Sequence, residues 1–491
     1  RVLDRAPEFL PVMDIFGKPD YLDLPDTFYK HTLPTPVKNP ELAAFNIDLA
    51  KSFGLSENWG KTHLQTLAGN TNPKNAYPIA MAYCGHQFGH FAGVLGDGRA
   101  ILIGQAQDTD GRTHDIQLKG AGQTPYSRRG DGRATLGAVL RECLTSEAMA
   151  GLGIATTRSL AAIRTGEPVF RERVEPGAIL VRTARSHIRV GTFEYAARLD
   201  AGDAVQDLTR YMIEHHFTDI KNTPTPERAL LARVIKQQAH LIAQWMGVGF
   251  IHGVMNTDNM SIVGETIDYG PCAFLDTYQH DKVFSSIDHH GRYAYNNQAS
   301  IALWNLTRFA ETLLPVLAPA PKDAVKIAQT ELGKFALQFS RAYTRIFAQK
   351  FGIDPQAATT PDFITTALQM LQDEGLDFTL FFHRLSLIAC GESRTLFLDM
   401  FPQQETGEMW LKLWQRAKSK SAATMQSANP VYIARNHQVE RAIQAAESGD
   451  LSVFTRLMRA FATPFTANAE FDDLQIPPRP EEEVTQTFCG T

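Results

Sequence analysis

The chain has 491 residues, of which 44% are hydrophobic and 21% are charged, and this is the composition of an ordinary globular protein. Glycine (35 residues) and proline (26 residues) are too few for a collagen-like or low-complexity chain. The net charge of −5 excludes a histone-like protein that binds nucleic acid or an anionic membrane through its overall charge. At roughly 150 residues per domain, the length corresponds to about three domains, or to one two-lobed unit with extensions.

The five cysteines are sparse, and no two of them form a CxxC pair, so neither a zinc ribbon nor a thioredoxin motif is expected. Such cysteine usage suits a reducing compartment. No uninterrupted apolar run reaches about 18 residues, the length of a membrane-spanning helix, and residues 1–5 are too charged for the apolar part of a signal peptide. We expect a soluble monomer without nucleic-acid or membrane partners, cytoplasmic if the source is bacterial. Because residue 1 is not Met, the question whether an organelle-targeting leader has been removed stays open.

The first two segments of the chain differ in texture. Residues 1–75 are rich in proline and short apolar clusters, and we interpret them as an N-terminal extension. Residues 76–200 alternate short apolar runs with glycine clusters, which is typical of strands joined by tight loops. A helix is expected where apolar residues recur at helical spacing, over residues 136–149. Strands are expected at residues 100–104, 116–119 and 178–182.

Beyond about residue 200 the pattern becomes helical. The clearest helix spans residues 226–246, with Pro226 near its start and Gly247 after its end. Further helices are expected at residues 299–317, 323–351, 361–372 and 439–446. A strand-rich part followed by a helical part indicates an α+β fold and resembles the two lobes of a protein kinase. We therefore expect an N-lobe over residues 76–200 and a C-lobe over residues 201–400. A helical C-terminal extension with a flexible tail is expected over residues 401–491.

Four features of the chain follow the order that they have in kinases. The first is a glycine-rich stretch that contains Gly96, Gly98 and Arg99, where backbone N–H groups can approach phosphate oxygens. The second is Lys119, at the end of a predicted strand, with Glu142 on the following helix as the expected partner of its ammonium group. Taken alone, the stretch also fits an ordinary turn, and Lys119 an ordinary surface lysine.

The third feature matches the kinase catalytic loop H-x-D-x-x-x-x-N, and the fourth matches the D-F-G triplet. Asn259 and Asp268 fall where the two metal ligands belong. Val254 occupies the place of the usual catalytic Asp and cannot accept a proton, so Asp258 is the nearest carboxylate for that role. The simplest alternative for Asp258 and Asn259 is an Asx-type turn.

Longer strings carry a more specific resemblance. They are A-Y-C-G-H-Q-F-G, Q-L-K-G-A-G-Q-T-P-Y-S-R and H-G-V-M-N-T-D-N-M-S, at residues 82–89, 117–128 and 252–261. In these strings the chain resembles the selenoprotein O family of pseudokinases, which are protein adenylyltransferases, and N-P at 429–430 and R-N-H at 435–437 extend the resemblance over most of the chain. The resemblance implies a kinase fold that binds ATP in a flipped orientation. It also implies transfer of AMP, rather than of the γ-phosphoryl group, to hydroxyl side chains of proteins.

A cluster of arginines gives the flipped orientation a physical interpretation. Residues 127–133 form a second basic, glycine-rich loop, and Arg182 and Arg189 lie on or after the next predicted strand. Arginine forks bind phosphate bidentately. We therefore expect Lys119, Arg182 and Arg189 to hold the β- and γ-phosphates deep in the cleft, so that the α-phosphorus faces the metal. Taken singly, each arginine also fits a surface salt bridge.

The resemblance implies the remaining roles. Asp131 and Gly132 match nucleotide contacts, Arg182 and Arg189 match phosphate contacts, and Asp258 matches the proton acceptor. The expected reactants are ATP and proteins with Ser, Thr or Tyr hydroxyls, and the expected metal is Mg²⁺, with Mn²⁺ as the alternative. A kinase-like phosphotransferase and a non-catalytic ATP-binding scaffold stay as alternative functions.

Two further expectations concern cysteine and histidine. Cys84, His86 and His90 are close enough in sequence for a metal site, but the intervening glycines disfavour a helix that would present both histidines on one face, and we expect no zinc. The resemblance supports a functional cysteine near the C-terminal end of the chain. Cys489 could reach Cys272, which follows the Asp268 triplet, and form a redox-sensitive disulfide; the alternative is two unrelated thiols.

Overall fold

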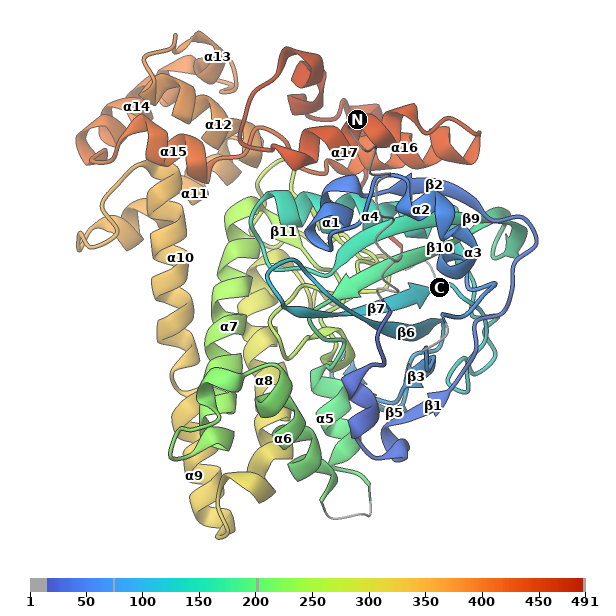
Figure 1. Ribbon diagram of the computed structural model, residues 1–491. Coiled ribbons are helices and arrows are strands. Elements are labelled where there is room, and N and C mark those ends of the chain that lie inside the picture. The colour runs from blue at the N-terminus through green and yellow to red at the C-terminus, as the bar shows by residue number, and fades with distance from the viewer. Residues whose placement is uncertain (1–15, 74–75, 200–202, 489–491) are drawn as a thin grey trace, which may run out of the picture.

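The computed structural model describes residues 16–73, 76–199 and 203–488. Within these residues, eight strands form one antiparallel sheet in the order β1-β3-β6-β7-β10-β9-β2, and β8 pairs with β10 (Figure 1). The bounds are β1 Tyr29–His31, β2 Glu41–Phe45, β3 Ile79–Met81, β6 Ala100–Gln107, β7 Thr113–Lys119, β8 Ala134–Thr135, β9 Arg158–Phe170 and β10 Val174–Ala184. Two smaller sheets pair β4 Cys84–Gln87 with β5 His90–Val94, and β11 Phe250–Ile251 with β12 Ala273–Phe274.

Both faces of the main sheet are buried, because helices cover each of them. Side chains of a strand alternate between faces. On β6, Ile101 and Ile103 join the cluster that contains Leu49 and Trp59, whereas Leu102 joins the cluster that contains Leu140. The first cover consists of the short helices α1 Ile47–Ser52, α2 Trp59–Thr62 and α3 Leu64–Leu67; the second is α4 Leu136–Gly151. Burial on both faces explains why the strands appear in the sequence as continuous apolar runs.

The three predicted strands are confirmed within β6, β7 and β10, and the predicted helix over 136–149 is confirmed as α4. The prediction missed β9, which has 13 residues. Gly166 and Pro168 interrupt its second half in the sequence, and such residues indicate a turn rather than a strand. The segment before residue 76 supplies β1 and β2, which are the two edge strands of the main sheet.

The helical part begins after β10. Its long helices α7, α8 and α10 run side by side next to the sheet (Figure 1). The helices are α5 Val190–Ala196, α6 Ala204–His215, α7 Pro226–Val248, α8 Gln298–Leu317, α9 Pro321–Leu332, α10 Phe335–Phe351, α11 Thr360–Asp373, α12 Phe378–Ala389, α13 Thr395–Leu398, α14 Gln404–Ala417, α15 Ala422–Ala428, α16 Asn436–Glu447 and α17 Ser452–Ala462. Short 3-10 helices are η1 Asp20–Asp23, η2 Asp26–Phe28, η3 Thr218–Ile220, η4 Thr257–Asn259, η5 Tyr295–Asn297, η6 Ala469–Gln475 and η7 Pro480–Glu482.

At two glycines the helices differ from the prediction. The helix predicted over 323–351 is two helices, because α9 ends at Leu332 and Gly333 caps it before α10 begins. Glycine has a low helix propensity and favours such an end. The helix predicted over 226–246 is α7, and it continues past Gly247 to Val248. Gly249, at φ 73°, is its left-handed C-terminal cap.

The C-terminal extension returns to the strand-rich part. Helices α16 and α17 lie across α4 (Figure 1), and their apolar side chains, such as Ile443 and Phe454, belong to the same buried cluster as Leu140. A separate aromatic cluster fills the space between α10, α11, α12 and α14. The α+β class, with a sheet-rich N-terminal part and a helical C-terminal part, is therefore confirmed.

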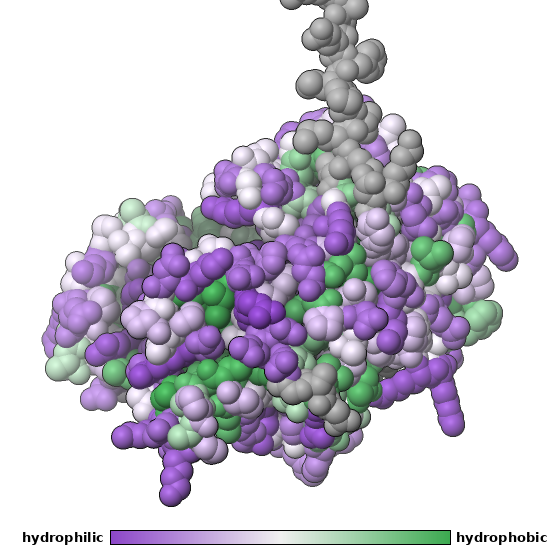
Figure 2. All heavy atoms as spheres, turned by 60° about the horizontal axis from the view of Figure 1, so that its bottom comes forward, coloured by the Kyte–Doolittle hydropathy of each residue, from purple (hydrophilic) through white to green (hydrophobic). Residues whose placement is uncertain are grey.

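One face of the protein is mainly polar. Figure 2 shows one face on which hydrophilic residues predominate and hydrophobic residues gather in a few separate areas. None of the helices in the described ranges combines the length and the apolar character that crossing a bilayer requires.

Candidate active site

A cleft of about 1190 Å³ lies between the sheet and the helical part. It is lined by the ends of β7 and β10, by α4, and by the segments around η4 and the Asp268-Tyr269-Gly270 triplet. The structure brings most of the predicted site residues to this cleft. They are Gly98, Arg99, Lys119, Asp131, Gly132, Glu142, Arg182, Arg189, Asp258, Asn259 and Asp268.

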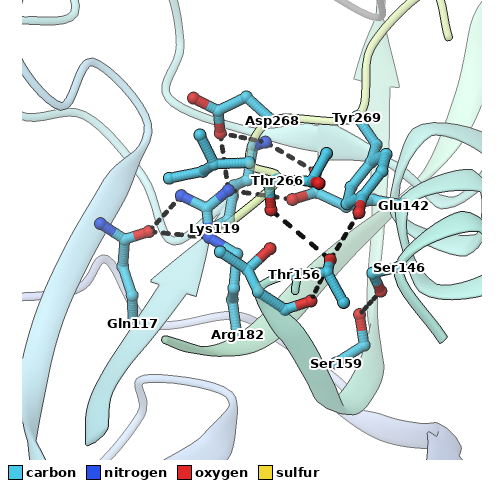
Figure 3. Close-up of polar contacts among 12 residues, drawn as sticks. Gln117, Lys119, Glu142, Ser146, Thr156, Ser159, Arg182, Thr266, Asp268 and Tyr269 are labelled. Atoms are coloured by element: carbon cyan, nitrogen blue, oxygen red, sulfur yellow. Dashed lines mark hydrogen bonds and ion pairs between the residues drawn. The ribbon is translucent and has the colours of Figure 1, made fainter. Parts of the chain in front are cut away.

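Lys119 lies at the centre of the polar network in the cleft (Figure 3). Its Nζ is 2.6 Å from Glu142 Oε2 on α4 and 3.2 Å from Asp268 Oδ1. Strand β7 places Lys119 at its end, and α4 packs under the sheet so that Glu142 faces it. A strand lysine paired with a helix glutamate is the arrangement found in active kinases, so the predicted pair is present.

Arg182 is buried beneath Lys119 and has three acidic or amide partners. Its Nη1 is 2.9 Å from Glu142 Oε1 and 2.6 Å from Asp268 Oδ1. Its Nε and Nη2 donate to Gln117 Oε1 at 3.2 and 2.6 Å. Gln117 in turn lies two positions before Lys119 on β7, on the same face, and holds the planar guanidinium in place (Figure 3).

Arg189 approaches Asp268 from the other side. Its Nη1 contacts Asp268 Oδ2 and donates to the main-chain oxygen of Asp258 at 2.6 Å. Its guanidinium lies 4.7 Å from the centre of the Tyr83 ring, which is cation–π distance. Three cations, Lys119, Arg182 and Arg189, therefore converge on one carboxylate at the bottom of the cleft.

The three cations determine the charge of the acidic groups among them. Burial opposes ionisation of Asp268, but the charges of Arg189, Lys119 and Arg182 outweigh it and hold the pKa of Asp268 well below its usual range. The pKa of Glu142 is lowered in the same way, since Lys119 and Arg182 outweigh the effect of its burial. Both carboxyl groups are therefore ionised at neutral pH, as ligands and ion-pair partners need to be.

Asp258 has a different environment. It lies in η4, is buried, and burial raises its pKa to about 7. Gln87 Nε2 is 3.4 Å from Asp258 Oδ2, whereas Asp258 Oδ1 has no hydrogen-bond partner within the described residues. Val254 also lines the cleft and supplies no acceptor side chain. Asp258 thus places a carboxylate of raised pKa in the lining of the cleft, as a general base requires.

Asn259 and Asp268 offer oxygen ligands on the same side of the cleft. Asn259 donates its Nδ2 to the main-chain oxygen of Val254 at 3.0 Å, which leaves Oδ1 available. Asp268 has φ 60°, a left-handed conformation that is unusual for a residue with a side chain. One amide and one carboxylate oxygen match the few protein ligands that Mg²⁺ takes next to phosphates. In the described part of the chain, no cluster of three or more His, Cys, Asp or Glu side chains forms a metal site by itself.

The glycine-rich loops contribute in two ways. Gly132, at φ 69°, lies where a Cβ would overlap the main chain of Gly122, and Asp131 next to it binds Arg171 at 2.9 and 3.0 Å. Gly98 lines the cleft, but Gly96 is absent from its lining. A Cβ at Gly96 would overlap the ring of Tyr126, so the structure gives this glycine a packing role.

The cysteines and histidines that the sequence analysis considered lie in two parts of the protein. Cys272 is buried, whereas Cys489 lies outside the described residues, so the disulfide stays a prediction. Nearby, Thr487 Oγ1 donates to the main-chain oxygen of Pro271 at 2.6 Å. Cys84, His86 and His90 lie in the β4–β5 hairpin, where His86 Nδ1 contacts Glu194.

Three residues that support the site were not predicted. Gln117, Gln87 and Tyr83 support Arg182, Asp258 and Arg189 through the contacts described above. Gln117 alone had a signal in the sequence, because residues two apart on a strand share a face and Lys119 was already a candidate. Nothing local indicated the partners of Gln87 and Tyr83, which are more than 100 residues away in the chain.

Comparison with known proteins identifies the family. A family model described as "Protein adenylyltransferase SelO" matches residues 11–462. The chain belongs to this SelO family. Among its relatives, a "Protein nucleotidyltransferase YdiU" of Rhizobium etli is 47% identical over 481 residues, with 96% of each chain covered. A protein of the same name from Rhodopseudomonas palustris is 50% identical over 484 residues, with 96% of this chain and 98% of that chain covered.

A solved structure was also found by comparison of folds. It is ROP2 from Toxoplasma gondii, described as a virulence factor with a protein-kinase fold and no enzymatic activity. It covers 67% of this chain and 94% of its own, at 9% identity and a TM-score of 0.29. A similarity of this size supports no inference about activity.

Proposed function

We propose that this SelO-family chain is a protein adenylyltransferase that uses ATP to attach AMP to Ser, Thr or Tyr hydroxyls of proteins and releases pyrophosphate. The observation that carries this proposal is the convergence of Lys119, Arg182 and Arg189 at the bottom of the cleft. A kinase that transfers the γ-phosphoryl group needs the outermost phosphate at the mouth of the cleft, next to its base. Here three cations converge at the bottom instead, which favours binding of the β- and γ-phosphates there.

The remaining residues fit a reaction at the α-phosphorus. A protein hydroxyl oxygen attacks this phosphorus, the bond to the bridging oxygen of the β-phosphate breaks, and pyrophosphate leaves with the bonding electrons. Asp258 accepts the hydroxyl proton through its carboxylate, which lines the cleft. Lys119, Arg182 and Arg189 neutralise charge on the leaving pyrophosphate.

Asn259 Oδ1 and the carboxylate of Asp268 would hold a divalent metal ion, Mg²⁺ or Mn²⁺. When bound, such an ion supplies positive charge to the phosphate oxygens next to the reacting phosphorus. Asp131, Gly132, Gly98 and Arg99 line the outer part of the cleft, and we assign the nucleoside to them. Lys119 and Glu142 complete the site by keeping α4 at a fixed distance from the sheet.

ATP labelled separately at the α- and γ-phosphates tests the proposal. The purified chain is incubated with each label, a divalent metal and candidate proteins, and the labelled proteins are then counted. Protein-bound α-label without γ-label is the expected result. Transferred γ-label would instead indicate a phosphotransferase, and binding of ATP without any transfer would indicate a scaffold.

A further inference from the structure

The β4–β5 hairpin, residues 84–94, lies outside the main sheet and packs against α5 and η4. A two-stranded hairpin is marginal by itself, so its place depends on these contacts. Through them the hairpin reaches three consecutive residues of the catalytic loop, Asn256, Thr257 and Asp258. The proposed function assigns a role only to the last of these.

A closed ring of hydrogen bonds joins the hairpin, α5 and the loop. The main-chain N–H of His86 donates to Thr257 Oγ1 at 2.7 Å, and Thr257 Oγ1 donates to Glu194 Oε2 at 2.6 Å. Glu194 Oε1 then contacts Nδ1 of the His86 ring. Thr257 is fully buried, so its hydroxyl acts as both acceptor and donor without water. We call this set the His86–Glu194–Thr257 ring.

The hairpin also restrains the residues on either side of Thr257. The main-chain N–H of Phe88 donates to Asn256 Oδ1 at 3.1 Å, with Phe88 itself in a left-handed conformation at φ 51°. On the other side, Gln87 Nε2 lies 3.4 Å from Asp258 Oδ2. Gly85 faces Asp258 so closely that a Cβ there would overlap Asp258 Oδ1. The free oxygen of Asp258 therefore lies against a backbone surface that a larger residue would close.

We propose that the β4–β5 hairpin positions Asp258 for proton transfer, with the His86–Glu194–Thr257 ring fixing the loop and Gly85 leaving room for the carboxylate. His86, Glu194, Thr257 and Gly85 are positioning residues in this proposal and do not contact the reactants. The proposal rests on the role of Asp258 in the proposed function. Left-handed strain at Phe88 agrees with it, because such conformations persist where the surroundings hold them.

Gly85→Ala is the most specific test. Gly85 does not have a left-handed conformation, so alanine fits its backbone and the added methyl acts mainly by pushing on Asp258 and on Leu95. We expect kcat to fall about 100-fold, as for a displacement of about 1 Å at a reacting group, while the KM for ATP stays unchanged. Gly333→Ala, at the end of α9 with φ −60°, is the matched control and should retain wild-type kcat.

The same change in an Asp258→Ala background separates this proposal from the proposed function. Without the carboxylate, Leu95 is the nearest group that the added methyl still meets. In this background Gly85→Ala should therefore leave the residual rate unchanged and should lower the stability less than it does in the wild type. Urea unfolding of the four proteins measures this coupling without activity. Wild-type transfer by Asp258→Ala would overturn the base role of Asp258 and the hairpin proposal with it, but not adenylyl transfer itself. Absence of coupling in the unfolding cycle, or a Gly85→Ala kcat within about twofold of wild type, would overturn the hairpin proposal.

Thr257 gives an independent test of the ring. Thr257→Val keeps the shape but removes the hydroxyl, and kcat should fall about 10- to 100-fold with the KM for ATP unchanged. Thr257→Ser keeps the hydroxyl and should restore most of the rate. Thr312→Val, which removes a buried hydroxyl that bonds the main chain within α8, should leave kcat unchanged. Equal rates for the Val and Ser variants of Thr257 would overturn the positioning role, since loss of packing would then explain both.

Discussion

Arg189 shows how one side chain can serve several parts of the site. It contacts Asp268, the main chain of Asp258 and the ring of Tyr83, and these three lie in different segments of the chain. Five fixed N–H donors make such multiple contacts available to arginine but not to lysine. In the absence of phosphate the guanidinium balances Asp268, and bound phosphates would offer it a second anion.

Arg189→Ala should therefore weaken binding of ATP far more than binding of AMP, which lacks the two outer phosphates. Each charge-assisted hydrogen bond that is lost costs about 1.5–3 kcal/mol, so the Kd for ATP should rise roughly 10- to 150-fold. Calorimetric titration with both nucleotides measures the difference. Arg189→Lys keeps the positive charge but loses the bidentate guanidinium. Its Kd for ATP should therefore lie between those of the wild type and of Arg189→Ala. Equal weakening of ATP and AMP would contradict the flipped orientation.

Asp268→Ala should abolish transfer of α-label, because the proposed metal site loses its only carboxylate. The variant also leaves Lys119, Arg182 and Arg189 close together without a shared anion, so ATP itself should still bind. Filter binding and the transfer assay distinguish the two effects. Transfer at the wild-type rate would exclude Asp268 as a metal ligand. A chelator added to the wild-type protein should have the same effect as the substitution.

Residues of the site could be predicted from the sequence where a fixed spacing defines their role. Lys119, Glu142, Asn259 and Asp268 follow such spacings, and the structure brings them to one cleft. The His86–Glu194 contact could not be predicted, because its partners are 108 positions apart and a histidine in a strand has no preferred partner. The role of Gly96 near phosphate stays a prediction, and its close packing against Tyr126 could not be predicted, because a glycine needed for packing and one needed near phosphate look the same in a sequence.

At the scale of elements, α10 carries an unusual buried charge. Two of its aromatic residues, Phe335 and Phe347, are buried. Lys350 on the same helix is buried as well, with Nζ 4.3 Å from the centre of the Phe382 ring. Burial lowers the pKa of Lys350 to about 7. No spacing rule could predict this lysine, because lysine is almost never fully buried.

The low pKa of Lys350 predicts a pH dependence of stability. Between about pH 7 and the usual lysine value, the unfolded chain binds a proton that the folded protein does not, so stability rises with pH in this window. Below about pH 7, Lys350 is protonated in the folded protein as well, so the full free-energy cost of burying its charge is present. Lys350→Met should therefore stabilise the protein by a few kcal/mol at pH 6.5 and by much less at pH 9.5.

Urea unfolding of the wild type and the variant at both pH values measures the change. Lys326→Met, which alters an exposed lysine on α9, is the matched control and should show no such pH dependence. A Lys350→Met effect that is the same at both pH values would contradict the prediction, since packing alone does not titrate.

At the scale of the whole molecule, Arg435 joins the C-terminal extension to the segment that follows the Asp268 triplet. It is buried, and its guanidinium lies 2.7 Å from Asp276 and 2.9 Å from Asp377. It also donates to the main-chain oxygen of Gln475 at 3.0 Å. The next residue, Asn436, makes hydrogen bonds of 3.2 and 2.9 Å with the N–H and the oxygen of Phe274 on β12. The extension thus fixes the segment that kinases commonly order by phosphorylation.

Arg435→Ala should strongly destabilise the protein, because it leaves the buried Asp377 and the partly buried Asp276 without their shared cation. Burial raises the pKa of Asp276 to about 6 although Arg435 lowers it, so its ionised form depends on this partner. Breaking a buried pair on one side costs about 3–5 kcal/mol. Arg456→Ala removes an ion pair with Asp473 at the surface of the same extension and should cost less than about 1 kcal/mol. Urea unfolding of both variants measures the two losses of stability. If both losses were small and similar, Arg435 would not hold the extension to the catalytic segment.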